Sequence, residues 1–356
     1  MHKLNVNEST EPIDGCGIEV SAEELVVGLR RQGEAGPTCR TFPNSAPGHQ
    51  QIGRYLARPG RRVRACMEST GVYGLDLALR LAKVPGLEVM VANPRAVRHF
   101  AVADMRRSKN DRLDAAVLVE FAARMRFRPW QPPSPAAMQL HALARRLAAL
   151  TAMRTAEKNR WHAAQVSETT PLALRRDLER SLRSLRRASD RLTREAVKVI
   201  EQDDGLRLRF QLLLSAHGIA PTSAVQILAE LAVISPDLTV RQWVAHAGLD
   251  PREYSSGTSV HKKTRISKVG NRQLRRALYM PALVAVRRQP HFRAFYQHLV
   301  ARGKTKMQAL VASMRKLLHA IYGMFKHQQP FDGSKVYRLA TDLPPAEFAF
   351  STREAA

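Results

Sequence analysis

The stretch Ile13-Asp-Gly-Cys-Gly-Ile-Glu-Val20 decides how the first part of the chain folds, because it predicts a strand with a carboxylate near its end. A second apolar run, Val63-Arg-Ala-Cys-Met-Glu68, ends in the same way. A charged residue that ends an apolar strand seldom serves packing. Glu19 and Glu68 are therefore candidates for chemistry.

Asp111 and Asp114 complete a set of four acidic residues. They stand three apart in Ser108-Lys-Asn-Asp-Arg-Leu-Asp-Ala115, a spacing that places both carboxylates on one face of a helix. The formal net charge is +26, so carboxylates gathered in one place need a cationic partner. Mg²⁺ is the natural candidate, since it takes oxygen ligands and bridges to phosphates. Spacing alone leaves open that these are four of 31 acidic residues with no shared role.

Three strands are predicted close together, at residues 13–20, 24–29 and 38–42. Strands and helices alternate after them, which indicates a mixed sheet flanked by helices. That order is typical of a ribonuclease-H-like (RuvC-like) domain, although periodicity alone does not distinguish it from other α/β folds. The fold class expected for the whole chain is α/β followed by all-α.

A proline-rich segment, residues 129–135, marks a linker before a helical region. Leucines recur at helical spacing in 140–150 and 178–199, which predicts two long helices with narrow apolar seams. An antiparallel or intermolecular coiled coil and a plain intramolecular helical hairpin fit these seams equally. Beyond them, residues 250–272 are predicted to form a loop rich in Ser, Gly, Lys and Arg. The predicted divisions are an N-terminal extension (1–12), a RuvC-like catalytic domain (13–128), a linker and coiled-coil region (129–208), a C-terminal domain carrying a serine loop (209–331) and a tail (332–356).

The overall composition narrows the class of partner. Lys and Arg number 57 against 31 Asp and Glu, which points to a polyanion. No apolar run is long enough to span a membrane, and the first residues lack the apolar segment of a signal peptide. The three cysteines lack zinc-site spacing and are expected to be buried thiols in a reducing cytoplasm. A cytoplasmic protein is therefore expected.

A hydroxyl-rich turn, Tyr254-Ser-Ser-Gly-Thr-Ser259, is a second centre of interest. Ser256 stands beside Gly257, which lets backbone or phosphate approach closely. A serine there could attack a phosphate if its proton has an acceptor and the phosphate charge is neutralised. From the residues alone, a flexible basic loop whose serines only hydrogen-bond phosphates fits better. The cations predicted to bind nucleic acid are Lys262, Lys263, Arg265, Lys268, Arg272, Arg275 and Arg276.

Eight short segments follow one another in the order seen in one known family. They are Gly17-Ile-Glu-Val-Ser21, Glu68-Ser-Thr-Gly-Val-Tyr73, Val91-Ala-Asn-Pro94, Lys109-Asn-Asp-Arg-Leu-Asp-Ala115, Gly248-Leu-Asp-Pro251, Ser256-Gly257, Arg265-Ile-Ser-Lys-Val-Gly-Asn271 and Leu274-Arg-Arg-Ala-Leu-Tyr-Met-Pro281. The chain closely resembles the DEDD-type transposases of bacterial insertion sequences. These are related to the pilin-gene invertase, and some members are guided by a bridge RNA. The resemblance runs from about residue 13 to residue 331.

The resemblance implies a site and a reaction. Glu68, Asp111 and Asp114 match the family's second, third and fourth acidic residues, which bind Mg²⁺ in a RuvC-like domain, with Mn²⁺ as a substitute. Ser256 matches the serine that attacks DNA and becomes covalently joined to it. The implied function is Mg²⁺-dependent DNA cleavage and strand exchange by an insertion-sequence transposase.

The same resemblance implies partners. Double-stranded DNA would serve as donor and target, and a structured bridge RNA would guide the choice of target. The central helices would mediate dimer contacts and RNA binding. The active site would be composite, with the acidic domain of one subunit meeting the serine domain of another in a homodimer or homotetramer.

One departure from the family concerns the first acidic position, which is usually Asp and here is Glu19. Its carboxylate keeps the charge but lies one methylene further out, and Mg²⁺ sites tolerate little displacement, so metal binding is expected to be retained but weakened. Two alternatives to the transposase reading stay open. One is a RuvC-like nuclease or resolvase that uses metal-activated water, and the other is a catalytically degenerate nucleic-acid-binding derivative.

Overall fold

The computed structural model describes residues 12–68, 71, 73–105, 110–257 and 260–339. All but Pro12 of the predicted N-terminal extension lies outside these ranges, as do the last residues of the predicted tail. The chain divides into two compact units, Met1–Pro132 and Pro133–Ala356. The long central helices belong to the second of these units.

The first unit is built on a five-stranded sheet with the order β3-β2-β1-β4-β5. Strands β1, β2 and β3 pair antiparallel, whereas β4 pairs parallel with β1 and β5 pairs parallel with β4. The predicted mixed sheet is therefore confirmed, and its likeness to ribonuclease H stays a prediction. The strands are β1 (Ile13–Val20), β2 (Glu24–Arg30), β3 (Thr38–Pro43), β4 (Arg62–Glu68) and β5 (Leu87–Ala92).

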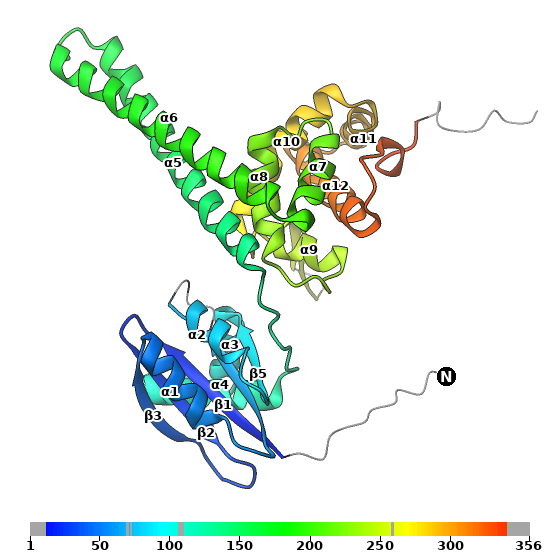
Figure 1. Cartoon of the computed structure of the whole chain (residues 1–356). Helices are drawn as coiled ribbons and strands as arrows, with labels where there is room; N and C mark the ends of the chain where they lie inside the picture. The colour runs from blue at the N-terminus through cyan, green and yellow to red at the C-terminus, as the bar shows by residue number, and fades with distance from the viewer. Residues whose placement is uncertain (1–11, 69–70, 72, 106–109, 258–259, 340–356) are drawn as a thin grey trace, which may run out of the picture. The chain divides into compact units, whose positions relative to one another are not determined.

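Helices cover both faces of this sheet (Figure 1). Alternate residues of a strand point to opposite faces, so Ile18 packs in one cluster and Cys66 in the other. Helices α1 (Ala46–Leu56) and α2 (Leu75–Leu81) share the cluster of Ile18. Helices α3 (Pro94–Ala103) and α4 (Asp111–Arg124) share the cluster of Cys66.

The second unit begins with two long helices that pack along each other, α5 (Pro135–Val166) and α6 (Leu172–Glu201), drawn in green in Figure 1. Only a short turn joins them, so they run antiparallel. The leucine seams therefore meet within one chain, as the intramolecular hairpin interpretation had it. A serine side chain begins α5, because Ser134 accepts a hydrogen bond from Ala137 N at 3.1 Å.

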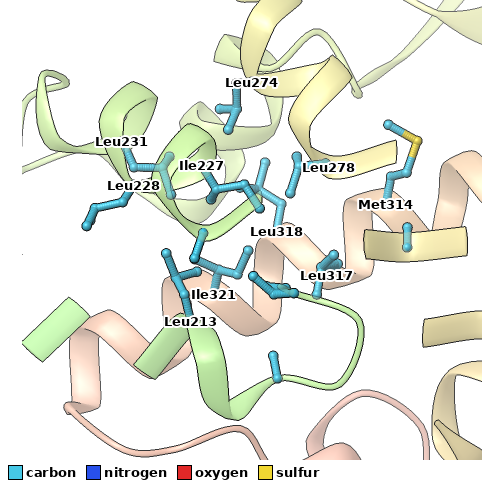
Figure 2. Packing of buried hydrophobic residues seen from close by; sticks show 14 of the residues in the cluster. Leu213, Ile227, Leu228, Leu231, Leu274, Leu278, Met314, Leu317, Leu318 and Ile321 are labelled. Carbon is cyan, nitrogen blue, oxygen red and sulfur yellow. The ribbon is translucent and has the colours of Figure 1, made fainter. Parts of the chain in front are cut away.

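The remaining helices of the second unit surround one apolar core. Figure 2 shows Leu213, Ile227, Leu278 and Ile321 converging there, each from a different helix. No helix among the described residues is both long and apolar enough to span a membrane. The elements are α7 (Asp204–Ser215), α8 (Pro221–Ala232), α9 (Val240–His246), β6 (Pro251–Ser256), β7 (Val260–Ile266), α10 (Arg272–Arg288), α11 (Pro290–Ala301), α12 (Lys306–His327) and the short η1 (Gly333–Lys335).

Candidate active site

A glycine in β1 lets helix α4 lie directly on the sheet. A Cβ atom on Gly17 would fall 2.1 Å from Ala115 O and 2.7 Å from Val119 N, so no larger residue fits there. Gly15, two residues earlier in β1, faces Val119 instead. Helix α4 therefore runs against the direction of β1, and its first turn lies by the strand's C-terminal end. That first turn contains Asp111 and Asp114.

Glu19 and Glu68 stand at the same end of the sheet. The parallel register pairs Ile18 with Met67, so Glu19 and Glu68 follow at adjacent positions on neighbouring strands. Gly17 and Cys66 are also paired, and both face α4. Because side chains alternate along a strand, Glu19 and Glu68 point to the α4 face as well. The backbone thus brings Glu19, Glu68, Asp111 and Asp114 to one edge and one face of the sheet. We call this set of four positions the acidic edge.

The acidic side chains do not form a closed metal cage in this structure. Within the described ranges, no group of three or more His, Cys, Asp or Glu side chains is arranged to hold a metal ion. The donor set nonetheless suits a hard cation, since all four groups offer carboxylate oxygens. The α4 N-terminus also favours Asp111 and Asp114 electrostatically, which is a second reason for acids in this turn.

Two further observations describe this edge. Burial, with the charge of Glu68 as a second cause, raises the pKa of the Cys66 thiol to about 12. On the α1 and α2 side, a pocket of about 570 Å³ is lined by Asn44, Tyr73 and Arg80 among others. Asn44 Nδ2 donates to Ser21 O at 2.8 Å and to Tyr73 O at 3.1 Å. The pocket therefore adjoins the loops that follow β1 and β4, beside the acidic edge.

Ser256 lies at the tip of a two-stranded hairpin. Within the expected loop at 250–272, Pro251–Ser256 and Val260–Ile266 form strands β6 and β7, and Ser256, the last residue of β6, pairs with Val260. Every residue of β6 is exposed. Gly257 follows with a φ of +56°, a left-handed conformation that glycine adopts without strain. These strands were not predicted because β6 has no buried residue, so its sequence shows no apolar alternation.

The predicted cations differ in how the structure uses them. Arg265, Lys268, Arg272 and Arg276 are exposed. Arg275 is half-buried and donates to Ala247 O at 2.7 Å, which holds α10 against the end of α9. It therefore serves the fold, whatever it does with nucleic acid. Positions 262 and 263 lie in β7, and their side chains fall outside the described part of the chain.

Sequence reasoning missed one charged residue of this unit. Glu230 lies in α8 with 1% of its side chain exposed, and it accepts hydrogen bonds from Arg145 in α5 and Asn271 at the start of α10. A lone carboxylate in the apolar run Ala224 to Ala232 was the available signal, because unpaired charges are rarely buried.

Comparisons with known proteins agree with this architecture. A transposase family model matches residues 16–167, and a model described as the IS116/IS110/IS902 transposase family matches residues 210–297. A pilin gene-inverting protein of Moraxella bovis is 28% identical over 82% of this chain and 90% of its own length. The Moraxella lacunata protein of the same name is 29% identical over 75% of this chain and 81% of its own length. An uncharacterised 43.6 kDa protein of insertion element IS110 from Streptomyces coelicolor is 35% identical over 36% of this chain and 34% of its own length.

The first matched region covers most of the first structural unit and continues through helix α5 of the second, and the other lies within the second unit. Both models describe transposases. The class of protein is therefore a DNA transposase or recombinase. Together the matches span about two thirds of the chain. The chain belongs to the IS116/IS110/IS902 transposase family.

Proposed function

We propose that this chain cuts and rejoins double-stranded DNA through a covalent bond between Ser256 and DNA, with a divalent metal held by the acidic edge. The observation that carries the proposal is the placement of Glu19, Glu68, Asp111 and Asp114 on one face of one sheet edge. Acidic residues far apart in sequence seldom gather there without a shared ligand in so basic a protein. Mg²⁺, or Mn²⁺ in its place, is the ion that carboxylates and phosphates favour.

The serine supplies the nucleophile. Its Oγ forms a bond to phosphorus, the bond from phosphorus to one sugar oxygen breaks, and the hydroxyl proton leaves while the departing sugar oxygen gains one. A hydroxyl of the second DNA partner then attacks the phosphoserine and restores Ser256. The exposed tip of β6 lets the hydroxyl reach a backbone phosphate. The bound metal would neutralise phosphate charge during both transfers.

The neighbouring cations hold DNA in place. Arg265, Lys268, Arg272 and Arg276 are exposed around the base of the hairpin and at the start of α10, where they would pair with backbone phosphates. Such contacts carry no sequence information. A bridge RNA that pairs with the target would supply it, and the exposed arginines of α6 are the proposed RNA contacts, in a homodimer or homotetramer. These arginines are Arg176, Arg183, Arg186 and Arg187.

The test is a covalent adduct assay with labelled junction DNA in the presence and absence of Mg²⁺. The wild-type chain is expected to give a protein–DNA band on a denaturing gel only with the metal. Ser256→Ala should remove the band while DNA binding persists, and Ser255→Ala, its exposed neighbour, serves as the matched control. An adduct that persists in Ser256→Ala and disappears in Ser255→Ala moves the role to Ser255.

The same assay separates the alternatives. Metal-dependent cleavage without an adduct would indicate a nuclease that uses water, and neither product would indicate a protein that only binds nucleic acid. Metal binding is read independently from the electron paramagnetic resonance of Mn²⁺ added to the full chain. Asp111→Asn and Asp114→Asn should each reduce bound Mn²⁺, whereas Glu120→Gln, later in the same helix, should not.

A further inference from the structure

The hairpin that carries Ser256 depends on its base for its orientation. All of β6 is exposed, so this strand has no apolar packing of its own to fix its direction. At the base, Ser267 N donates to Asp250 O at 2.9 Å and Ser267 Oγ donates to Asp250 Oδ1 at 2.5 Å. These two bonds close the hairpin at the point where its two strands meet the helices.

The chain from this base runs directly into the start of α10. Gly270 has a φ of +116°, and a Cβ there would lie 2.3 Å from His246 O, so the segment is pressed against α9. Asn271 N then donates to His246 O at 2.6 Å. The Asn271 Oδ1 atom accepts from Gln273 N and Leu274 N at 2.9 and 3.0 Å and so begins α10. Asn271 therefore ties the segment that leaves the hairpin both to the end of α9 and to the start of α10.

Glu230 determines which way the Asn271 amide points. Its Oε2 accepts from Asn271 Nδ2 at 2.6 Å, which leaves Oδ1 as the atom that caps α10. The same carboxylate accepts from Arg145 Nε at 2.8 Å and from Arg145 Nη2 at 2.9 Å, a two-pronged contact from α5. Burial raises the pKa of Glu230, but His141, Asn271 and the charge of Arg145 outweigh it and hold the pKa below its ordinary value. The group is thus a buried anion with each oxygen engaged.

We infer that Glu230 is a positioning residue for the nucleophile: it joins helix α5 to the Asn271 cap and thereby sets the direction of the hairpin that presents Ser256. The inference rests on the proposed role of Ser256 in DNA cleavage. Helix α5 is also one arm of the long helical hairpin.

Glu230→Gln is the sharpest perturbation, because the amide has nearly the same size but one acceptor oxygen instead of two. The glutamine side chain cannot accept hydrogen bonds from both Arg145 nitrogens and from Asn271 Nδ2. At least one of these donors would then face the donor NH₂ group of the glutamine. Arg145→Gln is the second variant, since it removes the two-pronged contact from a side chain that is 44% exposed and keeps the bond between Asn271 and Glu230. Ile321→Val is the control, because Ile321 is an apolar side chain that lies fully buried in the core of the same unit. Its replacement tests the effect of a small loss of packing without changing the Glu230 carboxylate or its partners.

The first readout does not need catalysis. Spin labels are placed at Ser255→Cys on the hairpin and Ala149→Cys on α5, both exposed, in a Cys39→Ser background because Cys16 and Cys66 are buried. We expect a narrow distribution of distances between the labels in the otherwise wild-type chain and in Ile321→Val. Glu230→Gln and Arg145→Gln should broaden or shift it. An unchanged distribution in both variants would overturn the inference.

The second readout is the rate of adduct formation at saturating DNA. A misplaced nucleophile should slow this rate by about tenfold to a hundredfold in Glu230→Gln, while the Kd for DNA stays within about twofold of wild type. A variant that melts earlier but keeps the wild-type rate and distance distribution would show a purely structural carboxylate. If the wild-type chain forms no adduct but the label distances respond to Glu230→Gln, the proposed function fails and the positioning of the hairpin stands.

Discussion

The contact between β1 and α4 makes a sharp prediction about Gly17. Replacing it with alanine adds a methyl group whose Cβ would lie 2.1 Å from Ala115 O. This distance must increase to about 3.4 Å before it becomes an ordinary van der Waals contact. The nearest obstacles are backbone atoms of α4, which cannot rotate away as a side chain would. The helix must therefore move off the sheet or the strand must bend.

Two consequences follow in magnitude. Overpacking of this kind costs about 1–3 kcal/mol, and a backbone obstacle favours the upper end, so we expect the free energy of unfolding of the first unit to fall by about 2–3 kcal/mol. The shift also carries Asp111 and Asp114 away from Glu19 and Glu68. Because a metal site tolerates displacements of only about 0.5 Å, metal affinity should drop by about tenfold or more.

Gly28→Ala is the matched control. Gly28 faces the same residue of α4 from β2, but its added Cβ would lie 3.5–3.6 Å from Ala115, an ordinary contact. We expect a change of less than about 1 kcal/mol, because the lower entropy of the unfolded chain offsets any crowding. Scanning calorimetry and Mn²⁺ binding compare the two variants. Equal stability and equal Mn²⁺ affinity in Gly17→Ala and Gly28→Ala would refute the view that this close approach assembles the acidic edge.

Three further predictions concern the first unit. Burial raises the pKa of Asp14, but hydrogen bonding, chiefly from Arg61, outweighs it and holds the pKa below the ordinary 3.8. The unfolded chain therefore binds the proton more readily than the folded one, so the free energy of unfolding should decline as the pH falls below about 3.8. Asp14→Asn should lower the free energy of unfolding by about 1–3 kcal/mol at neutral pH. In acid titrations the variant should no longer show that decline. At pH 8, iodoacetamide should modify Cys39 and spare Cys66, because Cys66 is buried and its pKa is raised to about 12. Mass spectrometry of protein labelled in its native state measures both reactions. Equal modification of the two cysteines would contradict the burial of Cys66. Glu19→Asp should tighten Mn²⁺ binding and raise Mg²⁺-dependent cleavage if Glu19 weakens the site, and unchanged robust cleavage would show that Glu is tolerated there.

The sheet could be predicted from sequence because its buried strands are apolar runs along the chain. Residues 13–20 were predicted with the bounds that the structure gives, since they form an apolar run closed by turn residues. The helical seams likewise predicted α5 and α6. They could not say whether the partner helix comes from the same chain, because a seam records only that some apolar surface covers it.

The parts that escaped prediction depend on contacts distant in sequence or on exposed backbone. The β6–β7 hairpin is held by main-chain pairing, which leaves no apolar periodicity to read. Glu230 meets Arg145 and Asn271 only after α5, α8 and α10 have packed, and nothing local marks those partners. The four acidic residues were predicted to share a metal site because the motifs that contain them follow one another in the family's order along the chain. The structure adds that their backbone positions lie at one edge and on one face of the sheet.

The most direct test of the account is to locate the protein–DNA bond itself. The full chain is incubated with donor and target DNA and Mg²⁺, digested with trypsin, and the DNA-linked peptide is sequenced by mass spectrometry. We predict a single attachment at Ser256 that vanishes when the metal is chelated and in Glu68→Gln. Attachment at another residue, or an undiminished yield in Glu68→Gln, would contradict joint action of the acidic edge and the hairpin serine.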